Sequence, residues 1–312
     1  MKGDCTPKER KENMNVNKRN NYHLTGSIHT LSLSSEHVTD IDEQVAPCFD
    51  TLSNRENLSY SKINPNKLTG DIFSYDEFKT ALDTVLAGAG IESYNLRRFD
   101  MRFDSFNPEH YRDYAKLNRY LISALAVTYN VKNCYDSRNL FTQKQVSVAI
   151  KNKRFECENY DKAEESNGRD PAFARLELRS KSLTDNDIEK QFQGWYLRLD
   201  KALNNLDKVH QRYNDELERI YKEEKDSFPV KFRSLTDFLI QYQNCIFCKA
   251  QMVDLLSRFD EVKDPETRAK NHKKRYGIEY FSKKDLEHAV SEIKRASEKF
   301  FKGTDLTLFE KK

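Results

Sequence analysis

The sequence predicts an α+β fold, with a mostly antiparallel sheet and helices in the N-terminal part and an all-helical C-terminal part. Two observations support this. Up to about residue 184, segments that alternate polar and apolar residues are separated by helical patterns, whereas the chain beyond is almost entirely helical in pattern. The 312 residues, of which 37% are hydrophobic, suffice for one large domain or two ordinary ones.

The first elements follow from local patterns. Residues 27–34 and 57–64 alternate as strands do, and the second runs into an Asn-Pro-Asn turn signal at 64–70. Residues 74–89 carry apolar side chains at helical spacing. Ser74 is a suitable N-cap for this helix, with Glu77 three residues later to complete a capping box.

The middle of the chain continues the alternation. We expect a strand at 97–104, a helix over about 108–128, and another strand at 145–151. Residues 154–179 then form two strands around a Ser-Asn-Gly turn. This gives the order β-β-α-β-α-β-β-β.

The C-terminal part predicts three helical stretches, at about 185–224, 233–260 and 282–301. Phe228-Pro229 and Asp264-Pro265 are expected to break them. No long Gly/Ser linker precedes this part, so it is expected to pack against the sheet. Residues 1–25 are rich in Lys, Arg and Asn and are expected to form a disordered basic arm.

Three of the predicted strands carry ionisable side chains on one face, because alternate residues of a strand share a face. Apolar residues such as Phe99, Met101 and Phe103 fill the opposite face. The ionisable positions are Arg98, Asp100, Arg102 and Asp104; Glu156, Glu158 and Tyr160; and Arg175, Glu177 and Arg179.

This pattern suits metal-assisted phosphoryl transfer. Carboxylates hold hard divalent cations, and such a cation polarises a phosphate and favours a tyrosinate. A tyrosine hydroxyl can attack phosphorus and form a covalent ester. A solvated face of an antiparallel sheet is the alternative explanation.

Other signals exclude several classes of protein. There is no phosphate-binding Gly-x-x-x-x-Gly-Lys-Ser/Thr loop and no His-x-His pair. The single CxxC, Cys245–Cys248, lacks a second pair for zinc, and we expect two buried helix cysteines there. No apolar run suits a membrane span or signal peptide, which favours a cytoplasmic protein with reduced thiols.

A basic run lies between the last two predicted helices and contains no acidic residue. It is followed closely by Tyr276, Tyr280 and Phe281, and a basic run beside aromatic residues suits contact with DNA phosphates. A solvated loop is the alternative. Its basic residues are Arg268, Lys270, Lys273, Lys274 and Arg275.

Taken in order, these motifs resemble the rolling-circle replication initiators of Gram-positive plasmids (the Rep_trans type). The resemblance covers about residues 27–183, and the Tyr-x-Lys-x-x-Glu and Arg-x-Glu-x-Arg motifs are also similar to the nicking proteins of filamentous phages. The segments that carry it are Asn64–Thr69, Arg98–Asp104, Tyr160–Glu164 and Arg175–Arg179. The segment from Phe155 to Tyr160 is one residue longer than the family pattern, which would either move the tyrosine to another face or mark a bulge next to the site.

The resemblance implies a strand- and site-specific DNA nickase encoded by a plasmid, phage or integrative element. Tyr160 would be the nucleophile, left joined to the 5′ phosphate, and Lys162, Arg175 and Arg179 would neutralise the phosphate. Mg²⁺ or Mn²⁺ would be held by Asp100 and Glu177. Asp104, Glu156 and Glu158 would be further ligands or a base.

The resemblance also implies partners and a division of the chain. The partners would be double-stranded origin DNA and its nicked strand, a host helicase and a second copy of the chain. Residues 26–184 would be the nicking domain, and 185–312 would recognise the origin and form the dimer, with the basic run as a DNA contact.

Two other classes of function remain. A non-catalytic, sequence-specific DNA-binding initiator or regulator would explain the helical part and the basic run but leave the carboxylates without a role. A tyrosine recombinase would need an Arg…His-x-x-Arg set near its tyrosine, and the sequence has none.

Overall fold

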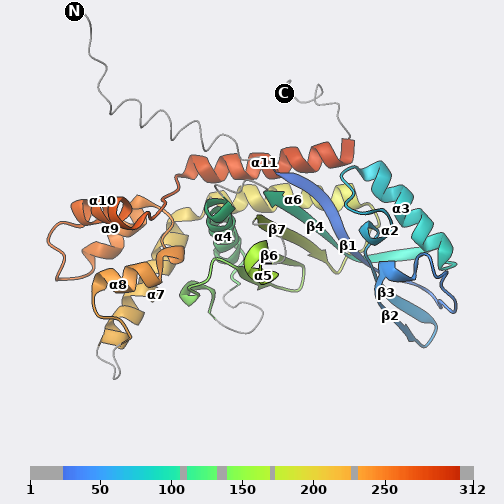
Figure 1. Ribbon diagram of the computed structural model, residues 1–312, viewed down its shortest axis with the longest axis horizontal. Coiled ribbons are helices and arrows are strands. Elements are labelled where there is room, and N and C mark those ends of the chain that lie inside the picture. The colour runs from blue at the N-terminus through green and yellow to red at the C-terminus, as the bar shows by residue number, and fades with distance from the viewer. Residues whose placement is uncertain (1–23, 106–110, 132–138, 169–172, 226–230, 303–312) are drawn as a thin grey trace, which may run out of the picture.

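The computed structural model describes residues 24–105, 111–131, 139–168, 173–225 and 231–302 (Figure 1). Its centre is a seven-stranded antiparallel sheet in the order β2-β3-β1-β4-β7-β6-β5. The strands are β1 Thr25–Glu36, β2 Phe49–Arg55, β3 Leu58–Ile63, β4 Tyr94–Ser105, β5 Val148–Lys151, β6 Phe155–Asp161 and β7 Ala174–Lys181. The predicted α+β class is confirmed.

Helices occupy most of the remaining described chain. In the N-terminal part these are α2 Asn66–Thr69, α3 Tyr75–Gly88, α4 Tyr111–Thr128 and α5 Lys162–Glu165, with short 3-10 turns η1 Ala46–Cys48 and η2 Leu140–Thr142. The C-terminal part contains α6 Ile188–Leu203, α7 Leu206–Lys225, α8 Leu235–Gln241, η3 Gln243–Cys245, α9 Lys249–Ser257, α10 Pro265–Tyr276 and α11 Lys283–Lys302.

One face of the sheet is covered by α4, α6 and α11 (Figure 1). The apolar residues of β4, including Phe99 and Phe103, are completely buried there and meet Phe192 of α6. Trp195 of the same helix donates from Nε1 to Ser180 Oγ of β7 at 2.9 Å. These helices therefore leave the other face, with the ionisable side chains, open to a ligand.

Several sequence predictions are confirmed at the level of single elements. The strands expected at 27–34, 57–64, 97–104 and 145–151 correspond to β1, β3, β4 and β5. The helix expected at 74–89 is α3, and its cap Ser74 accepts from the Glu77 amide as predicted. The predicted helix 282–301 is α11.

Other predictions were wrong in detail. Strand β2 was missed because its residues past Phe49 are all exposed, which leaves no alternating pattern. The stretch 185–224 is two helices, divided after Leu203, and 233–260 is α8, η3 and α9. The basic run lies in helix α10 rather than in a loop, because Asp264 caps the Thr267 amide and Pro265 occupies the first turn.

The two cysteines of the CxxC are not helix-core neighbours as expected. Cys245 ends η3 and is fully buried, whereas Cys248 is half-buried and caps α9 by accepting from the Gln251 amide. Most of the predicted basic arm, residues 1–23, lies outside the described residues.

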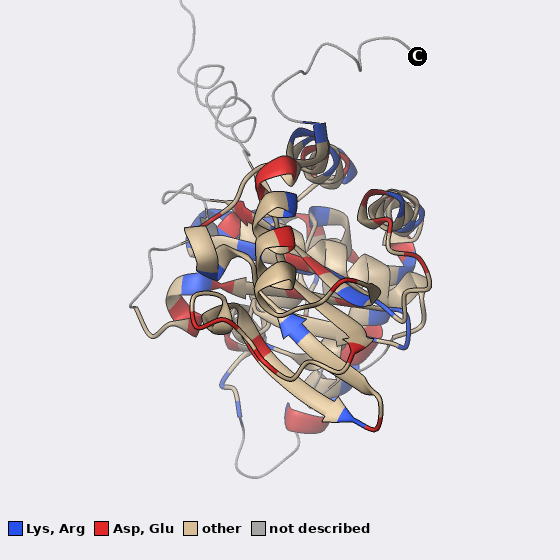
Figure 2. Ribbon diagram, turned by 90° about the vertical axis from the view of Figure 1, so that its right-hand side faces the viewer, with Lys and Arg blue, Asp and Glu red and all other residues tan. Residues whose placement is uncertain are grey.

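Helices α7 to α10 lie at the end of the molecule opposite β2 and β3 (Figure 1). Viewed from the β2–β3 end, basic and acidic residues are interspersed over the helices and strands (Figure 2), in keeping with a net charge of +3. No helix in the described part of the chain has the length and apolar character needed to cross a membrane.

Candidate active site on the open face of the sheet

The structure brings the predicted charged segments together on neighbouring strands, because β4, β7 and β6 are adjacent in the sheet. Each of three cross-strand rows combines one residue from each strand. The rows are Asp100–Arg179–Glu156, Arg102–Glu177–Glu158 and Asp104–Arg175–Tyr160. Between β4 and β7 every row pairs opposite charges, which favours cross-strand pairing, whereas Glu158 of β6 lies opposite Glu177 of β7.

Neither alternative for the longer segment before Tyr160 is found, since there is no bulge and Tyr160 shares the face of Glu177. The register between β6 and β7 runs without a shift from Phe155 to Asp161. A register shift does lie next to the site, but in β1 between Ile28 and Thr30, opposite β4. It places the His29 side chain against the central carboxylate of the site.

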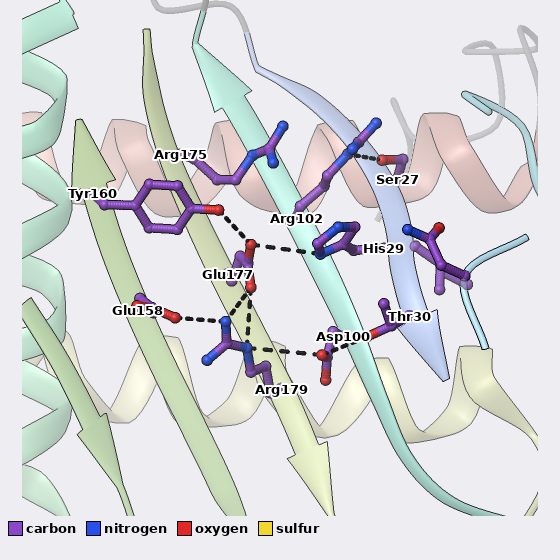
Figure 3. Close-up of polar contacts among 12 residues, drawn as sticks. Ser27, His29, Thr30, Asp100, Arg102, Glu158, Tyr160, Arg175, Glu177 and Arg179 are labelled. Carbon is purple, nitrogen blue, oxygen red and sulfur yellow. Dashed lines mark hydrogen bonds and ion pairs between the residues drawn. The ribbon is translucent and has the colours of Figure 1, made fainter. Parts of the chain in front are cut away.

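Tyr160 joins the polar contacts of the site through Glu177, which lies at their centre (Figure 3). Its hydroxyl donates to Glu177 Oε1 at 2.7 Å, and the Arg175 guanidinium lies beside the same hydroxyl. Burial raises the pKa of Tyr160 well above its usual range, and the Glu177 charge adds to this while Arg175 opposes it. The phenol is therefore protonated at neutral pH and hydrogen-bonded to a base.

Glu177, which accepts this hydrogen bond, is only 2% exposed. Burial would raise the pKa of this carboxyl, but the charge of Arg179, the charge of His29 once its ring is protonated at low pH, and the bond from Tyr160 lower it below the usual value. Arg179 bonds to its second oxygen, and His29 Nδ1 lies 3.6 Å from Oε1. Glu177 is consequently an ionised carboxylate at neutral pH.

Arg179 connects most of the remaining acids. Its guanidinium lies 3.0 Å from Glu156 Oε1, 2.5 Å from Glu158 Oε2 and 3.8 Å from Asp100 Oδ2. Asp100 also pairs with Arg98 at 2.6 Å and accepts from Thr30 Oγ1 at 2.7 Å. Burial raises the pKa of Glu158, partly offset by the charge of Arg179.

Asp104 and Arg175 form a separate buried pair. Arg175 Nε and Nη2 donate to the two Asp104 oxygens at 2.6 and 2.8 Å. Such a two-point arginine–carboxylate contact fixes both side chains. Asp104 is thereby held by Arg175 and Arg102, whose Nε lies 3.8 Å away, and does not line the pocket.

A pocket of about 510 Å³ opens over these residues. It is bordered by β1, β3, β4, β6 and β7, and by α5 beyond Tyr160. Its lining side chains are His29, Lys62, Arg98, Asp100, Ser147, Glu158, Tyr160, Glu164, Glu165, Glu177 and Arg179.

In this arrangement the predicted metal ligands are paired with arginines. Among the described residues, no three His, Cys, Asp or Glu side chains are grouped so as to hold a metal ion. The physical reason is that Asp100, Glu158 and Glu177 turn toward arginines, and Asp104 is taken by Arg175. A cation would require Arg179 to release carboxylates.

His29 is the site residue that the sequence reasoning missed. It is half-buried, and burial lowers its pKa, so the ring is neutral near pH 7. Asn66 holds the shifted backbone by donating to the carbonyls of Ile28 and His29. The signal in the sequence is His29-Thr30, two polar residues in a row between Ile28 and Leu31, which interrupts the alternation.

The other predicted site residues lie apart from this centre. Lys162, the first residue of α5, pairs with Glu165 at 2.5 Å, and its Nζ lies 5.8 Å from the centre of the Tyr160 ring. The five basic residues of α10 are all exposed, at the end of the molecule away from β2 and β3 (Figure 1).

Comparisons with known proteins add little to this geometry. No protein-family profile matches the chain, and no curated protein matches its sequence. A solved structure described as a rolling circle replication initiator protein from Geobacillus stearothermophilus aligns with 69% of this chain and 89% of its own. The identity is 9% and the TM-score is 0.27, too low to establish a shared fold.

Proposed function

We propose that this protein nicks one DNA strand at a specific origin through a covalent 5′-phosphotyrosine at Tyr160 and so initiates rolling-circle replication. The observation that carries the proposal is the 2.7 Å bond from the Tyr160 hydroxyl to Glu177, a buried carboxylate beside two arginines in an open pocket. A nucleophile bonded to a base that is itself held in place is the arrangement that covalent catalysis requires.

In the proposed step, the Tyr160 oxygen attacks the phosphorus while its proton passes to Glu177. The bond from phosphorus to the 3′ oxygen breaks, and that oxygen takes up a proton to become the 3′ hydroxyl that primes synthesis. Arg175, beside the Tyr160 hydroxyl, and Arg179, which lines the pocket, would stabilise the phosphate as it becomes five-coordinate. The raised pKa of Tyr160 makes proton removal the demanding part of the step.

The excess of carboxylates over cations in the pocket supports the prediction that a divalent cation takes part. The pocket is lined by five carboxylates, Asp100, Glu158, Glu164, Glu165 and Glu177, against three cations, Lys62, Arg98 and Arg179. A phosphodiester would add negative charge to a site that is already acidic. Mg²⁺ or Mn²⁺ would offset this charge, and Asp100, Glu158 and Glu177 are the residues that could hold it.

The proposal is tested with supercoiled plasmid that carries the gene and its flanking DNA, with and without Mg²⁺ or Mn²⁺. We expect cation-dependent relaxed circles with protein attached at a 5′ end, on the peptide that contains Tyr160. Tyr160→Phe should abolish attachment yet bind the origin nearly normally. Tyr196→Phe, a tyrosine of α6 on the covered side of the sheet, is the matched control. Cleavage by Tyr160→Phe equal to that of the wild type would reject the assignment.

A non-catalytic DNA-binding initiator is the second candidate. It is favoured by one observation, that the charged groups of the site largely satisfy one another, as in a structural network. Tight binding to a supercoiled origin without any nicking would select this candidate. Homodimer formation and recruitment of a helicase belong to the proposed initiator role and are tested by sedimentation and by pull-down with the host enzyme.

A further inference from the structure

The open face of the sheet continues beyond the pocket across β1 and β3. Lys62 of β3 borders the pocket, and Tyr60 lies two residues further along the same strand and therefore on the same face. Ser32 pairs with Lys62 and Ser34 with Tyr60, so small hydroxyl side chains separate these residues from β4. The result is a shallow polar surface rather than a continuation of the core.

A second register shift adds a cation to this surface. Between β1 and β4 the pairing passes from Ser32–Arg98 to Leu33–Leu96 and so skips Arg97. Arg97 therefore shares the open face with Arg98, and its Nε donates to Ser34 Oγ at 2.9 Å. Arg97 is exposed, and no carboxylate in the described part of the chain lies within 4.0 Å of its nitrogens.

Tyr60 provides an exposed ring on the same surface. It is 42% exposed, and its cross-strand neighbours are Ser34 and Ser53. Within the ranges that the structure describes, no other aromatic ring packs against it. Because its neighbours on the sheet are small serines, the exposed ring can receive a planar ligand on its face.

The charge next to the ring is also positive. Lys62 and Lys67 share one carboxylate, that of Asp50, at 3.1 and 2.7 Å. Two acidic residues lie beyond Tyr60: Glu36 is the last residue of β1, and Glu56 lies in the turn between β2 and β3. Arg97, Lys62 and Tyr60, here called the Tyr60 strip, therefore combine two cations and an aromatic ring between the pocket and that acidic margin.

We propose that the Tyr60 strip holds several unpaired nucleotides of DNA that lead into the pocket, with one base stacked on Tyr60 and phosphates at Arg97 and Lys62. This inference rests on the proposed function and deepens it by assigning the surface that guides the strand into the pocket. Stacked bases and a cationic groove are how proteins bind single strands. In a duplex the base faces are covered by one another, so a ring on a sheet cannot reach them.

The dimensions suit a short single strand. Tyr60 lies in the row of Ser34 and Asn95, and Glu177 lies in the row of Arg102, seven residues further along β4. At about 3.3 Å per residue the rows are roughly 23 Å apart along the strands. A chain that crosses this distance passes Arg97 and then meets Lys62 and Arg98 at the border of the pocket.

The test measures binding in the Tyr160→Phe background, where no cleavage interferes. Fluorescence anisotropy is recorded with labelled single-stranded oligonucleotides of increasing length and with the matching duplexes. Tyr60→Ala should weaken single-strand binding about tenfold or more, because that is the effect of losing one base–aromatic stack. Tyr60→Phe keeps the ring and should bind as the wild type does. Phe73→Ala, which removes an aromatic side chain that is 50% exposed, is the matched control.

Two further readouts make the result independent of folding. Oligonucleotides that carry 5-iododeoxyuridine should crosslink on irradiation to the peptide that contains Tyr60. Arg97→Gln should lower the slope of log affinity against log salt by about 0.7, the value for one phosphate contact on a single strand. Thermal unfolding of each variant shows whether it is folded.

Different outcomes reject different statements. Unchanged binding by a folded Tyr60→Ala variant, together with crosslinks elsewhere, overturns the Tyr60 strip even if Tyr160 nicks DNA. Equal loss for single strands and duplexes also overturns it. Conversely, a strip that binds single strands in a protein that never becomes attached to DNA would leave this inference standing and reject the nicking reaction.

Discussion

At the scale of single residues, the site depends on a diagonal contact. Tyr160 lies directly opposite Arg175, and Glu177 lies opposite Glu158, so the Tyr160–Glu177 bond joins residues two positions apart across β6 and β7. Arg175 is thereby free to bind Asp104 on its other side, in β4. Tyr160 is therefore hydrogen-bonded to Glu177, and Arg175 beside it is held in place by Asp104.

The Asp104–Arg175 pair leads to a stability prediction. Both side chains are at most 10% exposed, so Arg175→Met leaves the Asp104 charge buried with only the more distant Arg102. We expect the free energy of unfolding to fall by about 3–5 kcal/mol, the usual effect of removing one member of a buried pair.

Urea unfolding followed by circular dichroism measures this change. Asp104→Asn combined with Arg175→Met should cost less than the single Arg175→Met change, because no uncompensated charge remains. If the double variant is instead the less stable of the two, the pair is not the source of the effect.

Lys116 of α4 gives a prediction on pH. It is buried, its Nζ donates to the Glu279 carbonyl at 2.9 Å, and burial lowers its pKa to about 8 from the usual 10.5. Between these values the unfolded chain binds more protons at this residue than the folded chain does. The contribution of Lys116 to the free energy of unfolding therefore rises with pH across that window.

The measurement compares the wild type with Lys116→Met by urea unfolding at pH 8 and pH 10.5. Between these two pH values, the free energy of unfolding of the wild type should rise relative to that of Lys116→Met by at most about 3 kcal/mol. Using the difference between the two proteins removes the titration of tyrosines and cysteines, which both share. A difference that is constant over this range would show that Lys116 titrates normally.

At the scale of elements, α10 separates the basic run from the site. Its buried side consists of Ala269 and His272, so its lysines project into solvent. Lys270, Lys273 and Lys274 project within one 100° arc of an ideal helix, since each residue turns the helix by about 100°. Such a cluster suits duplex phosphates better than a reacting phosphate.

Replacing these three lysines with Gln should weaken duplex binding about equally for all sequences. The slope of log affinity against log salt should become less steep by about 0.9 for each phosphate contact that is lost. Lys283, Lys284 and Lys299 of α11, which are also exposed, give a matched triple control. An unchanged slope in the α10 variant would remove α10 from the duplex interface, while nicking of a pre-melted substrate should persist in either case.

The sequence predicted elements whose pattern is strong, and it failed where tertiary structure decides. The charged faces of β4, β6 and β7 follow from alternation alone, which is why Glu158 and Tyr160 could be placed on one face of β6, and Glu177 and Arg179 on one face of β7. The interrupted alternation at His29-Thr30 marks an irregularity, but the contact of His29 with Glu177 could not be predicted, because it depends on Asn66 holding the bulge from 37 residues away. The pairing of Asp104 with Arg175 depends on strand order, which alternation does not determine.

At the scale of the whole molecule, the predicted boundary after residue 184 does not separate two cores. Helices α6 and α11 lie on the sheet, and the buried apolar residues form one cluster from Leu24 to Phe300. The more distant helices are joined to it by Tyr120 of α4, whose ring stacks on Phe247 at 4.5 Å. Buried Arg119 donates to the Gln143 carbonyl and to Cys245 Sγ.

These contacts predict a single cooperative unfolding transition. Trp195, the only tryptophan, is fully buried between α6 and the sheet, so its fluorescence reports the sheet half. Far-ultraviolet circular dichroism is weighted toward helices and therefore reports α7 to α11 as well. In urea, both signals should have the same midpoint, because two-state unfolding makes different probes coincide. Arg119→Met should lower that common midpoint, since the guanidinium links α4 to η3. If the helical signal were lost before Trp195 became exposed, residues 185–312 would include an independently folding unit. A variant with α7 to α10 deleted would then be the next protein to test for nicking.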